Sequence, residues 1–181
     1  MAEPCFDPGG FYEFDLAAGA VRTRHGGRVL VLSDNVVGPL VSAAVHHGDL
    51  TAVRQMGKEI GADVQKSMSG EVADHAPADV IQCAADLISV FGWGRLSTER
   101  WGDALAIVMR EGPKLDEGRL GVAALLGGVF SILGGAEVAC VPIDSLRFLV
   151  VSPSIAEQVW MWSREGTDVS SIVGRLEAGE K

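Results

Sequence analysis

The feature that most constrains the fold is an uncharged run of 17 residues, from Leu120 to Ala136. The run is shorter than the roughly 20 residues that a helix needs to cross a bilayer, and five of its residues are glycine. Glycine inside a helix costs about 1 kcal/mol relative to alanine, so glycines at such positions indicate close packing against a neighbouring element. We therefore expect a buried core helix, which another helix or strand approaches closely at Gly127 and Gly128, rather than a membrane span.

The charge balance limits the partners that this chain can bind. Its 181 residues carry 15 Lys and Arg against 24 Asp and Glu, a formal net charge of -9. Such a surface repels phosphate backbones and anionic lipid headgroups, so we expect neither nucleic acid nor a membrane as partner.

A chain of this length buries roughly 70% of its unfolded surface on folding, which is enough for one domain with its own core. We expect a flexible leader over residues 1–10, without the basic and apolar stretches of a secretory signal, and one domain over residues 11–181.

The cysteines give no sign of a structural framework. Cys5, Cys83 and Cys140 are odd in number, far apart in the sequence and never in a C-x-x-C pair. This pattern fits neither a set of disulfides nor a zinc ribbon. We therefore expect a reducing, cytoplasmic environment.

Hydrophobic periodicity predicts an α+β fold, in which an antiparallel sheet of about four to five strands packs against a helical layer. Helix-capping and turn residues give the approximate ends of each element. The expected strands cover residues 11–15, 20–24, 28–32, 94–100, 104–110, 137–142 and 146–152. The expected helices cover residues 34–48, 49–69, 77–92 and 120–135, followed by a tail from residue 154 that forms one broken helix or two short ones.

The sequence contains no motif that supports catalysis. It lacks the Walker phosphate-binding loop, the G-x-G-x-x-G dinucleotide loop and the G-x-S-x-G nucleophile elbow. His46 and His47 are adjacent on a predicted helix, where side chains point about 100° apart and cannot hold one metal ion together. We assign no catalytic residue, no cofactor and no metal ligand, and we favour binding over enzyme activity.

Large aromatic side chains gather in two short windows. Phe91, Trp93 and Trp101 flank a predicted helix-to-strand transition, and Trp160 and Trp162 lie near the end of the chain. Aromatic residues serve as core packing, as ligand contacts or as interface anchors. All three roles stay open from the sequence.

Several short strings resemble the 4-vinyl reductase domain family, whose fold is shared with the Bet3-like subunits of the TRAPP vesicle-tethering complexes. The resemblance runs from about Arg28 to Ser152. It implies an α+β fold with antiparallel strands against helices, dimerisation through helices and, in bacterial sensor members, a small-molecule pocket. The strings are Phe91-Gly92-Trp93-Gly94, Glu137-Val138-Ala139-Cys140, Arg147-Phe148-Leu149-Val150 and Gly38-Pro39-Leu40, with Gly57 and Gly61.

The chain departs from this family at the metal site. The sensor members hold zinc with a glutamate and cysteines near the last strands. Cys140 matches the first cysteine of the final pair, but Leu146 stands where the second would be. We therefore expect no zinc, and a pigment-synthesis role has no redox motif to support it.

Three functions follow from this resemblance and the aromatic windows. The first is a homodimeric binding module, paired through the first two helices or the third, with a small apolar ligand in a cavity lined by Phe91, Trp93, Trp101 and Phe130. The second is an adaptor dimer without a ligand, in which Trp160 and Trp162 anchor a protein partner. The third, an enzyme acting on tetrapyrroles or aromatic compounds, rests on the family name alone.

Overall fold

A four-stranded antiparallel sheet organises the chain, in the strand order β4-β5-β7-β6. The structure is a computed structural model, and it describes residues 7–68 and 70–179. The predicted α+β class is confirmed. The strands of this main sheet are β4 (Arg95–Trp101), β5 (Ala104–Arg110), β6 (Ala139–Pro142) and β7 (Arg147–Val151).

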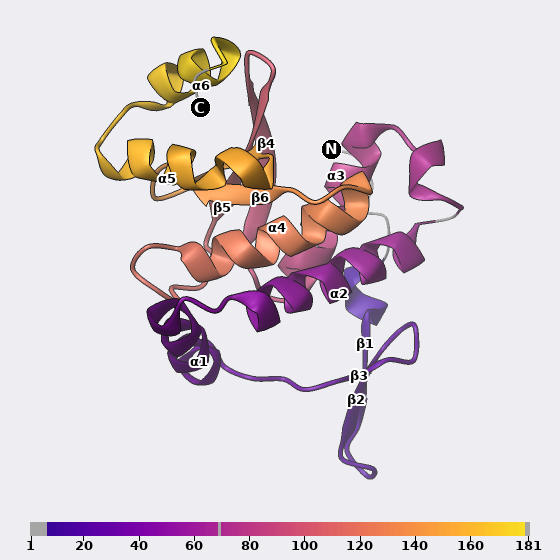
Figure 1. The fold of residues 1–181 in the computed structure, drawn as a ribbon. Helices are drawn as coiled ribbons and strands as arrows, with labels where there is room; N and C mark the ends of the chain where they lie inside the picture. Colours follow the sequence, from indigo (N-terminus) through magenta and orange to yellow (C-terminus); the bar gives the residue numbers. More distant parts are fainter. Residues whose placement is uncertain (1–6, 69, 180–181) are drawn as a thin grey trace.

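Helices cover both faces of the main sheet, which gives three layers (Figure 1). The sequence left open whether the C-terminal tail packs on the sheet or on another subunit; it forms two short helices on the sheet face opposite α4. The helices are α1 (Asp34–His47), α2 (Thr51–Ser67), α3 (Pro77–Val90), α4 (Leu120–Gly134), α5 (Ala156–Arg164) and α6 (Val169–Glu177), with short 3-10 turns η1 (Pro8–Gly10), η2 (Val72–Asp74) and η3 (Pro153–Ile155).

Alternation along the strands divides the interior into two cores. Successive strand residues point to opposite faces, so Ile107 and Met109 of β5 join the main core with α2, α3 and α4. Ala106, between them, joins a second core with α5 and α6. Both faces of the sheet are therefore apolar and buried at β5, whereas the edge strand β4 is mostly polar and exposed.

The α2–α4 crossing is the closest helix contact, and it depends on glycine in both helices. A Cβ atom at Gly57 would lie 1.9 Å from the carbonyl oxygen of Leu125, and one at Gly128 would lie 2.1 Å from the carbonyl oxygen of Arg54. The two backbones therefore touch. The uncharged run is a buried core helix as predicted, and among the described residues no helix has the length and apolar character needed to cross a membrane.

The first three strands form a separate sheet instead of joining the main one, in the order β1-β2-β3 (Figure 1). The apolar run 28–32 was predicted as one strand, but only Arg28–Val29 pair with a neighbour. Leu30, Val31 and Leu32 continue without a partner strand. The strands are β1 (Tyr12–Asp15), β2 (Ala20–Thr23) and β3 (Arg28–Val29).

The cysteines differ from the sequence-based expectation. Cys83 is disulfide-bonded, whereas Cys140 is a free, buried thiol. The odd number of cysteines led us to expect free thiols in a reducing environment, and a disulfide at Cys83 weakens that expectation. Cys5 and most of the predicted leader lie outside the described residues.

Candidate functional site

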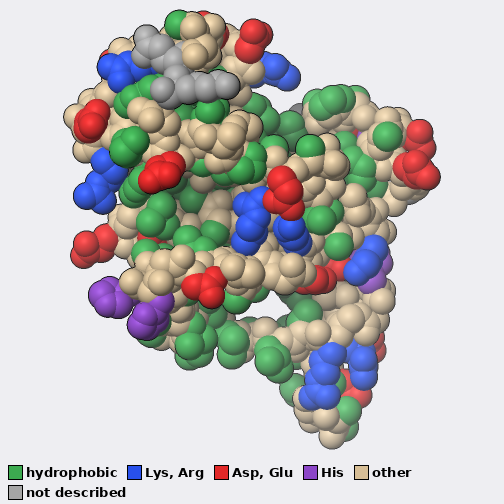
Figure 2. Space-filling model, in the orientation of Figure 1, with side chains coloured by type: hydrophobic (Ala, Val, Ile, Leu, Met, Phe, Trp, Pro, Cys, Tyr) green, Lys and Arg blue, Asp and Glu red, His purple; other side chains and the backbone are tan. Residues whose placement is uncertain are grey.

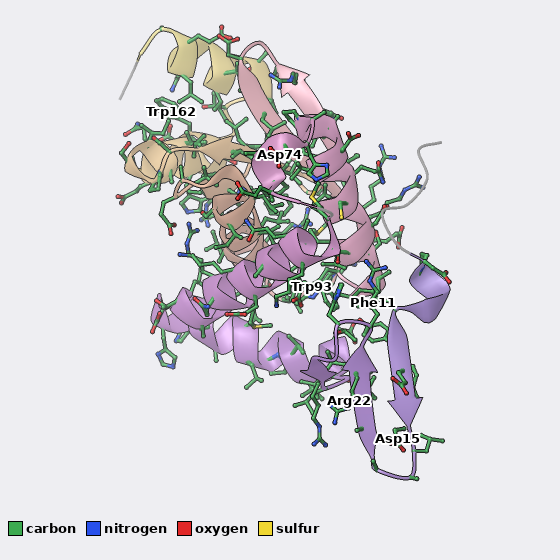
Figure 3. All side chains as sticks on the ribbon, turned by 90° about the vertical axis from the view of Figure 1, so that its right-hand side faces the viewer. Phe11, Asp15, Arg22, Asp74, Trp93 and Trp162 are labelled. Atoms are coloured by element: carbon green, nitrogen blue, oxygen red, sulfur yellow. The ribbon has the colours of Figure 1, made fainter. Side chains whose placement is uncertain are left out.

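Aromatic rings gather at one end of the main core, where α3 leads into β4. Phe91 and Trp93, two of the predicted ligand contacts, pack there against the buried cluster. Phe11 is fully buried beside them, with its ring centre 5.6 Å from that of Phe91 and 5.0 Å from that of Tyr12. Figure 3 shows Phe11 and Trp93 next to each other at this end of the core. We call Phe11, Tyr12, Phe91 and Trp93 the aromatic end.

The Tyr12 side chain is tied to the same place by a hydrogen bond. Its hydroxyl donates to the carbonyl oxygen of Val90, 3.3 Å away. Partial burial raises the pKa of Tyr12, because the phenolate would lose solvation. The hydroxyl therefore stays protonated at neutral pH and able to donate.

The other two predicted ligand contacts lie elsewhere. Phe130 of α4 is buried in the main core. Trp101, at the end of β4, packs in the second core, where its indole nitrogen donates to Glu99 at 3.2 Å and the Arg147 guanidinium lies 5.9 Å from its ring. The sheet therefore separates Trp101 from the other three residues.

The two tryptophans predicted as interface anchors differ in exposure. Trp162 is only 6% exposed and packs in the second core, with the Arg175 guanidinium 5.2 Å from its ring. Trp160 is half-buried and has the Arg164 guanidinium 5.7 Å from its ring. Of the pair, only Trp160 presents a substantial surface to solvent.

Two adjoining surface grooves lie around the loop between β5 and α4, with volumes of about 530 and 810 Å³. Both are open to solvent and share Glu117, Arg119 and Ser145. Trp160 and Arg164 line the smaller one. None of the four predicted ligand contacts lines either groove, and the mixture of charges suits a polar partner better than an apolar molecule.

The larger groove has strained backbone. Among the described residues, Glu111 and Arg119 are the non-glycine residues with positive φ, at 53° and 56°, and both line it. Such conformations cost about 1 kcal/mol or more each and persist where surrounding contacts impose them. Here the Arg119 guanidinium donates to the Ser145 carbonyl and lies 4.4 Å from the Phe148 ring centre. Burial lowers the pKa of Arg119.

The zinc site implied by the resemblance does not fit these residues. One Glu137 carboxylate oxygen accepts from Arg54, and the other accepts from Lys58. Burial raises the pKa of the Cys140 thiol to about 12, so it is not a thiolate at neutral pH. The described residues hold no group of three or more His, Cys, Asp or Glu side chains that could bind a metal ion.

This ion-pair cluster predicts a pH effect on stability. Hydrogen bonds from Lys58 and Arg54 lower the pKa of Glu137 from 4.5 to about 2. A lowered folded-state pKa stabilises the fold above the unfolded-state value, and this contribution is lost as the pH falls from about 4.5 towards 2. We expect Glu137→Gln to flatten the acid side of the stability profile relative to the unmodified chain, as measured by urea unfolding. The difference in stability between the two chains should shrink at high salt, because Glu137 is exposed and its ion pairs are screened. If the free energies of unfolding of the two chains fell in parallel as the pH is lowered, the prediction would be contradicted.

Sequence reasoning missed two parts of these sites. Phe11 was placed in a strand, and nothing local indicates that it contacts Phe91, 80 positions later in the sequence. Asp116 accepts from the backbone nitrogens of Leu120 and Gly121, at 2.7 and 3.0 Å, and so caps α4. Asp116 lies four residues before Leu120, and an acidic residue near the start of a predicted helix is a signal that could have indicated the cap.

Among solved structures, the chain is similar to the phenol-responsive sensory domain of the transcription activator PoxR with phenol. The similarity has a TM-score of 0.57 and covers 86% of this chain and 90% of that chain. The two chains share a fold. Their sequences are 14% identical, so the similarity shows the fold alone. No protein-family model matches the sequence, and no curated protein matches it.

Proposed function

We propose that the chain is a non-catalytic binding module of the 4-vinyl reductase type, which forms a homodimer and binds a small aromatic molecule at the aromatic end of its main core. The observation that carries this proposal is the shared fold with a phenol-responsive sensory domain, over 86% of this chain. The residues add support, because no catalytic motif occurs in the sequence and the aromatic end already holds rings of the right kind.

The chain's own side chains indicate the chemistry that the aromatic end accepts. Phe11 contributes a buried benzene ring, and Tyr12 contributes a phenol whose hydroxyl is bonded to Val90. A buried hydroxyl needs a hydrogen-bond acceptor. A phenolic ligand that displaced Tyr12 would find the same carbonyl, with Phe91 and Trp93 packing against its ring.

Tryptophan fluorescence tests where a ligand binds. We expect phenol, or a related small aromatic compound, to change the emission of the unmodified chain in a saturable way, because Trp93 lies at the aromatic end. Trp93→Phe should remove most of this change. The matched variant Trp101→Phe should keep it, because Trp101 lies in the second core.

Two other results would contradict a ligand site at the aromatic end. Loss of the response in Trp101→Phe alone would place the ligand across the sheet, and no saturable response to any compound of a phenol and benzoate panel would remove support for the ligand.

An adaptor without a ligand is the second candidate, and Trp160 favours it. This half-buried ring lines a surface groove beside Arg164, and tryptophan and arginine are common interface anchors. Native mass spectrometry of protein purified without added compounds distinguishes the two functions. A small molecule retained in the spectrum supports the binding module. A spectrum of polypeptide alone, together with no fluorescence response to the phenol and benzoate panel, supports the adaptor.

A further inference from the structure

One arginine side chain joins α2 to α4 and to the residues that lead into β6. Nη2 of Arg54, in α2, donates to the Ser131 hydroxyl of α4 at 2.9 Å and to the Val138 carbonyl oxygen at 2.7 Å. The same nitrogen donates to the Glu137 carboxylate. We call these four residues the arginine clamp. Their contacts fasten the connection between α4 and β6 to α2.

A glycine of α4 makes room for the guanidinium. A Cβ atom at Gly127 would lie 2.6 Å from Nη1 of Arg54, 3.4 Å from the Val138 carbonyl oxygen and 3.5 Å from the backbone nitrogen of Cys140. A side chain at this position would therefore displace the guanidinium. The close approach expected at Gly127 is thus made by an arginine side chain and by the start of β6.

The Ser131 hydroxyl completes the network. Ser131 is 6% exposed, and a buried hydroxyl is costly unless it is hydrogen-bonded. It donates to the Gly127 carbonyl oxygen at 2.7 Å and accepts from the Val138 backbone nitrogen at 3.0 Å, as well as from Arg54. These bonds use its one proton and both of its lone pairs. Loss of Arg54 would leave one of these lone pairs without its donor.

The charges of the clamp lie at its solvent side. Figure 2 shows basic side chains beside an acidic one in the middle of the face where α2 and α4 lie in Figure 1. Arg54 and Lys58 both pair with Glu137, whose side chain is 56% exposed, whereas the two basic side chains are 27% and 28% exposed. Exposed ion pairs contribute little to stability. The bonds from Arg54 to Ser131 and Val138 therefore carry most of the clamp's effect.

The clamp includes the residues at which the resemblance implies zinc. The glutamate there is Glu137 and the matching cysteine is Cys140. Burial raises the pKa of the Cys140 thiol and the charge of Arg54 opposes this rise, so the guanidinium acts on both residues. Zinc needs deprotonated ligands with free lone pairs, and a resident cation repels it.

We propose that the Arg54 guanidinium takes the structural role that the resemblance gives to zinc. It holds the connection between α4 and β6 against α2, and the fold of this chain is therefore independent of metal. This role rests neither on the ligand nor on the dimer of the proposed function. The phenol titration and the subunit number can each fail without affecting it.

The first test is the metal content of the full chain. The protein is expressed with added zinc, purified without chelator and analysed by inductively coupled plasma mass spectrometry. We expect no stoichiometric zinc, and we expect the same melting temperature before and after treatment with a strong zinc chelator. Stoichiometric zinc together with a melting temperature that falls on chelation would overturn the inference.

The second test is the removal of the guanidinium. Arg54→Met should lower the equilibrium constant for folding by about 10- to 100-fold in urea unfolding, since hydrogen bonds from a charged donor are lost. Lys66→Met is the matched control, because Lys66 is a basic residue of the same helix that pairs only within it, with Asp63. This control should change the constant by less than about 3-fold. Equal stability of the two variants would overturn the inference.

Hydrogen–deuterium exchange shows whether the effect is local. Arg54→Lys keeps the charge but loses the planar fork that reaches several acceptors. It should speed exchange over residues 135–142 by about 10-fold, and much less over β5 in the centre of the sheet. Equal changes in the two segments would mean that Arg54 supports the fold as a whole and is no clamp. If Arg54→Met does not fold, this comparison decides.

Discussion

Replacement of Gly57 by alanine should lower the free energy of unfolding by about 3 kcal/mol or more, near the upper end of the cost of overpacking. The new Cβ would lie 1.9 Å from the carbonyl oxygen of Leu125 and 2.8 Å from its carbonyl carbon. Both atoms belong to the α4 backbone, so no side-chain rotation can relieve the clash, and α2 and α4 must separate. Urea unfolding followed by circular dichroism measures the loss.

Gly174→Ala is the matched control for this prediction. Gly174 lies within α6, and a Cβ added there would meet no atom within 4 Å. Alanine is more favourable than glycine in a helix by about 1 kcal/mol, so this variant should be as stable as the unmodified chain or more so. A Gly57→Ala chain as stable as Gly174→Ala would mean that the two helices do not cross as closely as described.

Phe11→Ala should both destabilise the chain and create a site for a small aromatic molecule. Truncation of a fully buried phenylalanine costs about 3–5 kcal/mol, part of it from the cavity that remains. Phe11 is 0% exposed and packs edge-on against Phe91, so the cavity would have the size of a benzene ring and aromatic walls. Apolar cavities of this kind stay dry and bind benzene.

The measurement is the melting temperature of Phe11→Ala with and without benzene or phenol. Either compound should raise it, because a ligand that binds only the folded state stabilises that state. Phe14→Ala is the control from the same small sheet: Phe14 is 62% exposed, so its removal should leave no cavity and no response to benzene. If Phe11→Ala is destabilised but neither compound raises its melting temperature, the aromatic end must collapse when the ring is lost. This result would argue against a ligand site there.

The sequence predicted most elements of the fold because their signals are local. The third helix was expected over 77–92 and runs from Pro77 to Val90, since a proline starts it and its apolar stripe is regular. The uncharged helix was expected over 120–135 and ends at Gly134. The separate small sheet was not foreseen, because strand periodicity says which residues are extended but not which strands pair.

The candidate sites depended on contacts that no local pattern carries. Leu96 and Trp101 are an odd number of residues apart in β4, so they face opposite cores. Grouping Trp101 with Phe91 by proximity in the sequence ignored this alternation. Trp162 is buried because α5 packs on the sheet, and the sequence did not decide whether that helix covers the sheet or another subunit.

The glycine-lined crossing of α2 and α4 also sets the order in which the chain can acquire structure. Gly57 and Leu125, which touch there, lie about 70 residues apart, and contacts of such separation form late and slow the folding of a domain. A chain leaving the ribosome would expose the apolar face of α2 until α4 had been synthesised, an interval of several seconds at about 5–20 residues per second. Nascent chains halted before α4 are therefore the ones that we expect chaperones to hold.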